Sequence, residues 1–205
     1  MATFLDIIIA SIIGGVLLLG IINANNVVAE NSYIINGDVL VQQMLISTVQ
    51  IVEGEFRNMG VGVNEDSASV IFARDTAITF LSDIDRDGTP DRIEYWSGKV
   101  SELAHTQNER DRFLHRRVNG GTRQSIGIVT GFKLRYYSQG QLDTLTPPVA
   151  ANDLAMIKIV EITLEVQNSY ALYRDPRDVR PGEQSALFSS SYWRQTRLAS
   201  QNFKR

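Results

Sequence analysis

Cysteine is absent from this chain of 205 residues. Its absence excludes disulfide bonds, thiolate metal sites and a cysteine nucleophile, and it fits any cellular compartment. Basic residues are not in excess either. The formal net charge is −3, so the chain lacks the positive balance that nucleic-acid binding usually needs. We therefore expect no nucleic-acid partner.

Motifs typical of enzymes are missing as well. The only histidines, His105 and His115, belong to no metal-binding pattern, so a solvated or core position is the expected one for each. No phosphate-binding glycine loop and no serine nucleophile elbow occurs. The sequence thus favours a protein that is not an enzyme and has no small-molecule substrate. A hydrolase that uses a metal at the acidic loop described below is the one enzymatic alternative.

Charge is missing from a long stretch near the N-terminus. Ile7 to Ala29 contains no charged side chain, and no lysine or arginine occurs before Arg57. Ile7 to Ile22 is apolar on every face. At about 1.5 Å per residue, a helix over the whole stretch from Ile7 to Ala29 can cross a hydrocarbon core of roughly 30 Å. A secretory signal would begin with basic residues and end at a small-residue cleavage site. We interpret the stretch as a retained helix, with a plain membrane anchor as the alternative.

Asp6 lies directly before the apolar run. A carboxylate at the edge of a membrane helix is costly in lipid, so it suggests a function and a specific partner.

A second, amphipathic helical half is expected after residue 30. Apolar residues spaced three and four apart form a stripe for packing against a domain: Val41, Met44, Leu45, Val49, Val52, Phe56 and Met59. Asn36-Gly37 suggests a break in the helix, and Gly60 and Gly62 supply its stop. We expect three segments: a hydrophobic helix over 1–29, an amphipathic half over 30–62 and a globular β-rich head over 63–205.

Short β-branched and aromatic runs follow the glycines. They predict strands at 70–72, 77–81, 91–96, 132–137, 156–167 and 193–198. In the clearest strand, Val160, Ile162, Leu164 and Val166 alternate with polar residues, which predicts an antiparallel sheet with one wet face. Loops are expected at Pro147-Pro148 and over 174–184. An arginine cluster at 110–117, interleaved with acids, is expected to be a solvated face.

The helical stripe is what would cover the dry face of that sheet. The sequence therefore predicts an α+β protein, in which a long N-terminal helix packs on an antiparallel β-sheet domain.

One local motif has the spacing of a calcium-binding loop. The stretch from Asp83 to Glu94 has carboxylates at positions 1, 3, 5, 9 and 12 and a glycine at position 6. Strand-like flanks and a proline at position 8 argue against an EF-hand and favour a calcium-binding β-hairpin loop. The candidate ligands are Asp83, Asp85, Asp87, Asp91, the carbonyl of Thr89 and, with a side chain that can point elsewhere, Glu94.

The alternative for this loop is an acidic turn without metal, since aspartate and glycine are favoured in turns in any case. Four aspartates so close together repel one another without a cation, which favours Ca²⁺ as the bound ion.

The chain as a whole resembles the type IV pilin and pseudopilin superfamily. ATFLDIIIASIIGGVLLLGII is similar to the N-terminal segment of these proteins, in which an acid at the fifth mature position precedes a long helix. Counted from Ala2, Asp6 is at that fifth place, with aspartate where the family has glutamate. Further on, FRNMGVGV, ITFLSDIDRDGTPDRIEYW, FLHRR, FKLRYYSQG and IKIVEITLEVQ are similar, in that order, to PilW-type minor pilins and J-type pseudopilins.

The resemblance implies a structural subunit of an extracellular filament or pseudopilus. Its N-terminal helices would wait in the inner membrane and then pack into a central bundle, as a homo-oligomer or with other pilin-like subunits. The assembly residues implied are Ala2, Phe4, Asp6, Gly14 and Gly15. Asp6 would pair with the N-terminal amine of a neighbour, and the two glycines would allow close approach of backbones. A monomeric, membrane-anchored calcium-binding domain outside the cytoplasm is the alternative.

Overall fold

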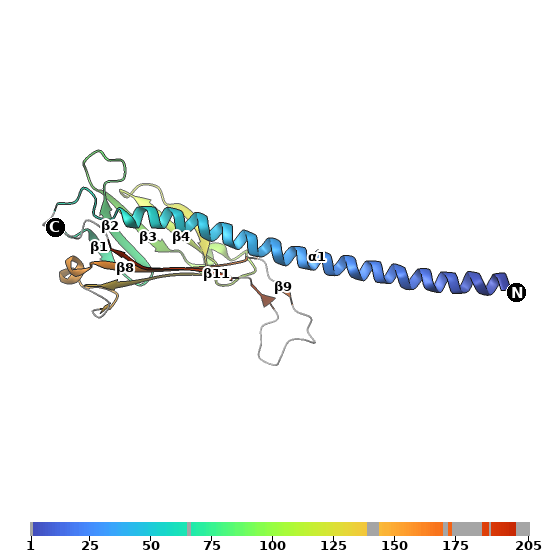
Figure 1. The fold of residues 1–205 in the computed structure, drawn as a ribbon. Coiled ribbons are helices and arrows are strands. Elements are labelled where there is room, and N and C mark those ends of the chain that lie inside the picture. The colour runs from blue at the N-terminus through green and yellow to red at the C-terminus, as the bar shows by residue number, and fades with distance from the viewer. Residues whose placement is uncertain are drawn as a thin grey trace. The chain divides into compact units, whose positions relative to one another are not determined.

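A computed structural model describes residues 2–64, 67–138, 144–169, 172–173, 186–188 and 190–199. The chain divides into two compact units, Met1–Val39 and Leu40–Arg205, which are described separately below. The expected segments 1–29, 30–62 and 63–205 remain predictions. Figure 1 shows the order of the elements along the chain.

Helix α1 runs without interruption from Ala2 to Arg57. The predicted break at Asn36-Gly37 is wrong: the helix continues through it. A single glycine costs a helix only about 1 kcal/mol, which a long helix tolerates. The predicted stop is confirmed. The helix ends at Arg57, and Gly60 and Gly62 take the left-handed conformation in the following turn, with φ of 84° and 76°.

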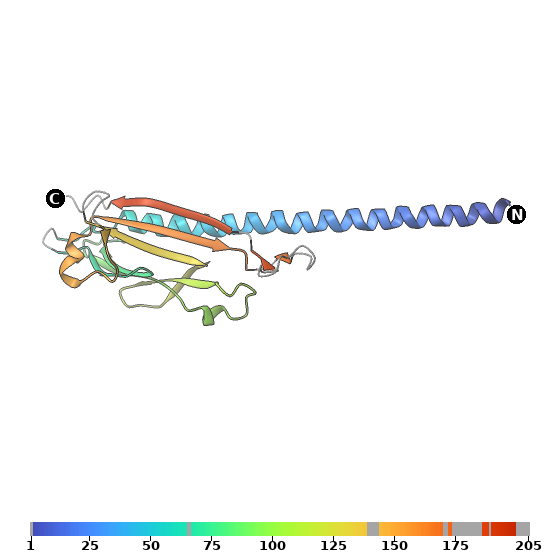
Figure 2. The same cartoon turned by 90° about the horizontal axis from the view of Figure 1, so that it is seen from below.

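The second unit contains two larger antiparallel sheets. One has the strand order β1-β2-β3-β4-β5 and the other β11-β8-β6-β7, with a separate pair of β9 and β10. Their bounds are β1 Val70–Ala73, β2 Ala77–Ser82, β3 Asp91–Ser97, β4 Arg112–Val118, β5 Gln124–Val129, β6 Gly131–Tyr137, β7 Thr144–Leu145, β8 Ile159–Gln167, β9 Leu172–Tyr173, β10 Ala186–Leu187 and β11 Ser190–Ala199. Two 3-10 turns, η1 Val100–Leu103 and η2 Ala151–Met156, lie between strands. Figure 2 shows β11, β8 and β6 side by side.

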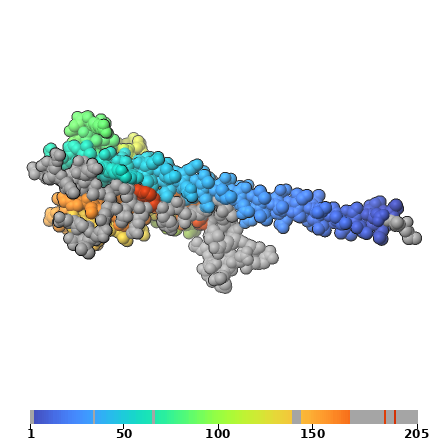
Figure 3. Space-filling view, viewed as in Figure 1, coloured from blue at the N-terminus to red at the C-terminus, as the bar shows by residue number. Residues whose placement is uncertain are grey.

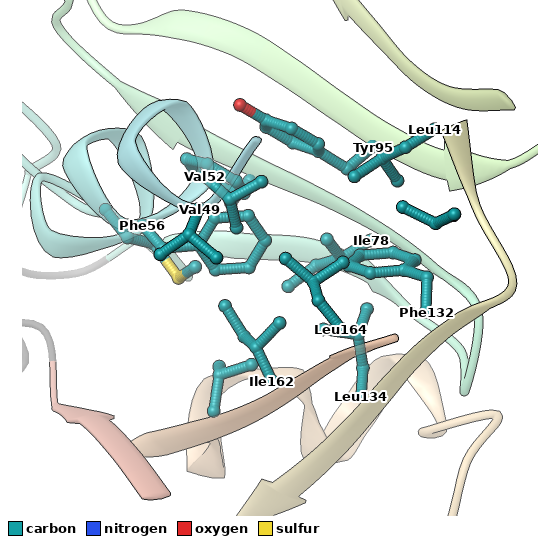
Figure 4. Close-up of a cluster of buried hydrophobic side chains, with 14 of the residues drawn as sticks. Val49, Val52, Phe56, Ile78, Tyr95, Leu114, Phe132, Leu134, Ile162 and Leu164 are labelled. Atoms are coloured by element: carbon teal, nitrogen blue, oxygen red, sulfur yellow. The ribbon is translucent and has the colours of Figure 1, made fainter. Parts of the chain in front are cut away.

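The core of the second unit lies between the amphipathic half of α1 and the sheets. Every residue of the predicted stripe is buried or half-buried. Phe56, fully buried, has its ring centroid 5.0 Å from that of Phe80 and 5.2 Å from that of Tyr95. Figure 4 shows stripe residues Val49 and Val52 among side chains from both sheets. The predicted α+β architecture, a long helix packed on an antiparallel β-sheet domain, is confirmed.

Each of the six predicted strands has a counterpart in β1, β2, β3, β6, β8 or β11. The sheets also contain β4, β5 and the two-residue strands β7, β9 and β10, which are not among the predicted ranges. Strand β5 (QSIGIV) contains Gly127, and glycine has a low strand propensity. A Cβ at Gly127 would overlap the Thr48 side chain of α1, so the glycine permits a close approach of helix and strand. The strand expected to begin at residue 156 begins at Ile159, after η2.

The two faces of β8 alternate as predicted, but the second face is not wet. Val160, Ile162, Leu164 and Val166 are each 0% exposed. On the opposite face Glu161 and Glu165 are only 5% and 8% exposed. Arginines cover them: Arg110 binds Glu165 at 2.8 Å, and Arg135 lies 3.6 Å from Glu161.

The loop at Pro147-Pro148 is present between β7 and η2. The loop expected over 174–184 lies outside the described residues.

Candidate functional site

The acidic loop is the connection between β2 and β3. The two strands form an antiparallel pair that begins at Ser82 and Asp91, so the residues between them are the tip of a hairpin. Arg86 and Gly88 take positive φ values of 61° and 88°, which turn the chain back on itself. Aspartates at alternate positions of this tip point several carboxylates into one small volume.

Three of the six predicted ligands lie together. One carboxylate oxygen each from Asp83, Asp85 and Asp91 lies within 4.8 Å of the others. Asp83 and Asp91 are half-buried and Asp85 is exposed. Calcium binds oxygens at about 2.3–2.6 Å, so oxygens at this spacing can share one ion. The donor set is all oxygen, which fits Ca²⁺ rather than a metal that prefers nitrogen or sulfur.

Two other predicted ligands, Asp87 and Glu94, are not part of that cluster. Asp87 Oδ1 accepts a hydrogen bond from the backbone N–H of Thr89 at 2.7 Å. Glu94 lies within β3, where its carboxylate is paired with Arg92 at 3.0 Å and with Arg117. The carboxylate of Glu94 is thus ion-paired with two guanidinium groups, and through Arg117 it links β3 to β4.

Backbone amides and one amide side chain already approach the aspartates. Gly88 N donates to Asp83 Oδ2 at 3.0 Å, and Ile84 N donates to Asp91 Oδ2 at 3.0 Å. Asn119 Nδ2 donates to Asp91 Oδ1 at 2.6 Å. These donors reduce the mutual repulsion of the carboxylates and fix their directions.

Asn119 is a residue of this site that the sequence analysis missed. It lies in the β4–β5 turn with φ of 50°, and its side chain also accepts from Arg92 N at 2.8 Å. The dipeptide Asn119-Gly120 is a strong hairpin signal and would have indicated the turn. Nothing in the sequence indicates that this turn reaches the acidic loop, because the contact spans 28 residues.

The acidic loop is also joined to the turn that ends α1. Asp83 N donates to Val61 O at 2.9 Å, and Ser82 Oγ donates to Asn58 O at 2.6 Å. A Cβ on Gly62 would lie 2.8 Å from Cβ of Asp83, so only a glycine fits there. The first predicted ligand is therefore positioned by the end of the helix.

The predicted assembly residues lie in the first unit, on an exposed helix. Phe4 and Asp6 are exposed, and a Cβ at Gly14 or Gly15 would meet nothing within 4 Å. Ala2 begins the helix, but its side chain lies outside the described residues. The structure contains one copy of the chain, so the contacts predicted for these residues stay predictions.

The helix is long and apolar enough to anchor in a membrane. Its most apolar window has a mean hydropathy of 2.6, and none of that window is buried. Figure 3 shows these residues in blue, and large aliphatic side chains are exposed along them, from Leu5 to Val28.

A charged cluster in the second unit joins α1 to the five-stranded sheet. Arg116 binds Glu55 at 2.5 Å, and Tyr95 donates its hydroxyl hydrogen to Glu55 at 2.5 Å. Burial, followed by the neighbouring Glu55 carboxylate, raises the pKa of Tyr95 far above its usual range. The hydrogen bond to Glu55 also raises the pKa of Arg116.

The arginine cluster, Arg110, Arg112, Arg116 and Arg117, is the expected solvated face in part: Arg110 and Arg112 are exposed, and Arg116 and Arg117 are half-buried. Arg116 and Arg117 are ion-paired across the sheet, and only Arg112 of the four makes no ion pair among the described residues. Of the histidines, His105 is exposed, whereas His115 is a core residue whose Nε2 lies 2.7 Å from Glu102. The hydrogen bond with His115 lowers the pKa of Glu102.

Comparison of the chain with protein-family models, with curated proteins and with solved structures gave no match.

Proposed function

We propose that this chain is a non-enzymatic structural subunit of a type IV pilus-like extracellular filament or pseudopilus. It assembles through its N-terminal helix with further copies or with other pilin-like subunits, and it is inserted in the inner membrane before assembly. Neither a nucleic acid nor a small-molecule substrate has a part in this function.

The exposed apolar helix carries the proposal. No charged residue occurs from Ile7 to Ala29, and the large apolar side chains of this stretch lie open to solvent. Burial of apolar surface contributes about 25 cal/mol per Å², so such a surface requires either lipid or other protein around it. A filament subunit needs both in turn, lipid before assembly and other subunits afterwards.

The amphipathic half of α1 supports assembly over simple anchoring. No charged residue occurs between Asp38 and Glu53, although this part of the helix has an outer face. Leu40, Ile46 and Ile51 are exposed on it, at 55%, 56% and 41%. A stalk that stayed in water would gain solubility from charge on that face, whereas a helix covered by neighbouring subunits needs none.

Substitution of Asp6 tests the proposal. In an assembled bundle its carboxylate would pair with a neighbour's N-terminal amine and set the axial register, because an unpaired charge in an apolar bundle is strongly unfavourable. Asp6→Ala is expected to abolish filaments and leave membrane insertion intact, as measured by electron microscopy and by membrane fractionation. Normal filaments from this variant would contradict the register role.

We further propose that Ca²⁺ binds the acidic loop and stabilises the head. Asp83, Asp85 and Asp91 would be its ligands, because their oxygens converge. The carbonyl of Thr89 is a further proposed ligand, and Asp87 would join the coordination only if the tip of the loop adjusts. Bound calcium would supply the positive charge that offsets the mutual repulsion of the four neighbouring aspartates.

A monomeric membrane-anchored calcium-binding domain is the second candidate. The apolar helix and the acidic loop fit it equally well, but it leaves the uncharged outer face of residues 39–52 without an explanation. The two proposals differ in whether the chain is recovered in surface filaments or only in membranes.

A further inference from the structure

The charges of the chain are unevenly distributed. Residues 1–39 contain three acids and no lysine or arginine, so the whole formal net charge of −3 lies in this segment. Two of these acids, Glu30 and Asp38, are exposed, and among the described residues neither has an ion-pair partner. Eight residues separate them, which is about 12 Å along a helix.

Two cations of the second unit, Lys99 and Arg112, form what we call the basic pair. The register of β3 and β4 pairs Ser97 with Leu114, and just beyond the end of β3 Gly98 N donates to Phe113 O at 2.7 Å. Lys99 follows Gly98 and Arg112 precedes Phe113, so the two cations flank this hydrogen bond. Both side chains are exposed. Within the part of the chain that the structure describes, neither makes an ion pair.

This pair differs from the other arginines around it. Arg110 is bound to Glu165, Arg116 to Glu55 and Arg123 to Glu102. Neighbouring like charges disfavour each other's charged form. The basic pair is therefore a place where an anion from outside would relieve repulsion.

We infer that the basic pair of one copy binds the Glu30–Asp38 segment of α1 in a second copy. This inference rests on the proposed self-assembly. A second copy is the occupant because the complementary charges are on the same chain, so that every subunit of a homopolymer offers both. A single exposed ion pair stabilises the association of two subunits only weakly. Because the same contact recurs at every subunit, many such small contributions act together in a filament.

Carbodiimide cross-linking of sheared filaments tests the contact directly. The reagent joins Lys99 Nζ to a carboxyl carbon of Glu30 or Asp38 as an amide only where the two touch, and it takes up the released water to become a urea. The expected result is a covalent dimer on a denaturing gel, whose cross-linked peptides join Lys99 to Glu30 or Asp38. Filaments without that cross-link would contradict the inference.

Charge reversal gives a second, independent test in producing cells. Lys99→Glu/Arg112→Glu alone, or Glu30→Lys/Asp38→Lys alone, is expected to lower the filament yield at least fivefold. The four changes combined should restore at least half of the normal yield. The control is Arg74→Glu/Lys133→Glu, which reverses two other exposed cations that lack ion-pair partners among the described residues and should leave the yield unchanged.

The outcomes separate this inference from the proposed function. If the unaltered chain forms no filaments, the proposed function fails and this contact with it. If filaments form and all variants yield them normally, or if the combined variant is no better than either pair alone, only the basic-pair contact is overturned.

Discussion

Gly62 lies so close to Asp83 that a Cβ on the glycine would be 2.8 Å from the Cβ of the aspartate. Gly62 is in the turn that ends α1, and Asp83 is the first residue of the acidic loop. The backbone of the same turn accepts a hydrogen bond from Asp83 N at Val61 O. The end of the helix and the candidate calcium loop therefore form one structural element.

Gly62→Ala is expected to destabilise the second unit by about 1–3 kcal/mol, because the new methyl group meets Asp83 and the φ of 76° disfavours any L side chain. Denaturant unfolding of the full chain in detergent measures the loss. Gly54→Ala is the matched control. Its Cβ would meet nothing within 4 Å and its helical backbone suits alanine, so this variant should be at least as stable as the parent. Equal effects of the two changes would contradict the proposed contact.

Calcium is expected to raise the melting temperature of the chain. An ion at 100 times its Kd stabilises by about 2.7 kcal/mol, and about 2–4 °C accompany each kcal/mol in a domain of this size. A rise of roughly 5–10 °C in differential scanning calorimetry is therefore the expected result. Asp83→Asn/Asp85→Asn should lose the rise, whereas Asp153→Asn, far outside the loop in sequence, should keep it. An equal rise in the double variant would place the calcium elsewhere.

Alkaline pH is expected to destabilise the head, because Tyr95 loses its phenolic proton less readily in the folded state than in the unfolded state. Burial and the Glu55 carboxylate raise its folded-state pKa above the unfolded value of about 10. The folded state thus holds the phenolic proton more tightly, so its stabilising effect is complete below that unfolded value and declines as the pH rises above it. Unfolding free energies measured between pH 8 and 11.5 should fall at the upper end.

Tyr95→Phe should flatten part of this decline, since it removes one of the two buried phenols. Tyr136, whose pKa is also raised by burial, supplies the rest. A pH profile identical to that of the parent would contradict the assignment to Tyr95.

Phe56→Ala is expected to cost about 3–5 kcal/mol, because it removes a fully buried ring that contacts Phe80 and Tyr95 in the core. Ile46→Ala, on the exposed face of the same helix, should change the stability by less than about 0.5 kcal/mol. Chemical denaturation of both variants gives the comparison. A similar cost at both positions would mean that the two faces of the helix are assigned wrongly.

The sequence predicted the features that depend on local pattern. The apolar stripe from Val41 to Met59, the glycine stop and the alternation along β8 each follow from a spacing of residues, and each is present. Features that depend on contacts distant in sequence were missed. The two-residue alternation along β8 predicts that Glu161 and Glu165 face solvent. Only the fold brings Arg135 and Arg110 over them.

The same distinction holds for the candidate site. The spacing of the aspartates indicated the hairpin loop, and three of them do converge. Glu94 has the right spacing for a ligand, but the pairing of β3 with β4 sets it against Arg117. Asn119 arrives from another hairpin, which no spacing within the loop can reveal.

The central claim, assembly into a filament, is tested most directly by electron microscopy of sheared surface material from producing cells, with mass spectrometry of the chain recovered there. The account predicts thin filaments that contain this chain as a stoichiometric or a minor subunit and that disappear in the Asp6→Ala variant. Recovery of the chain only from membranes, as a monomer, would contradict it and favour the anchored calcium-binding domain.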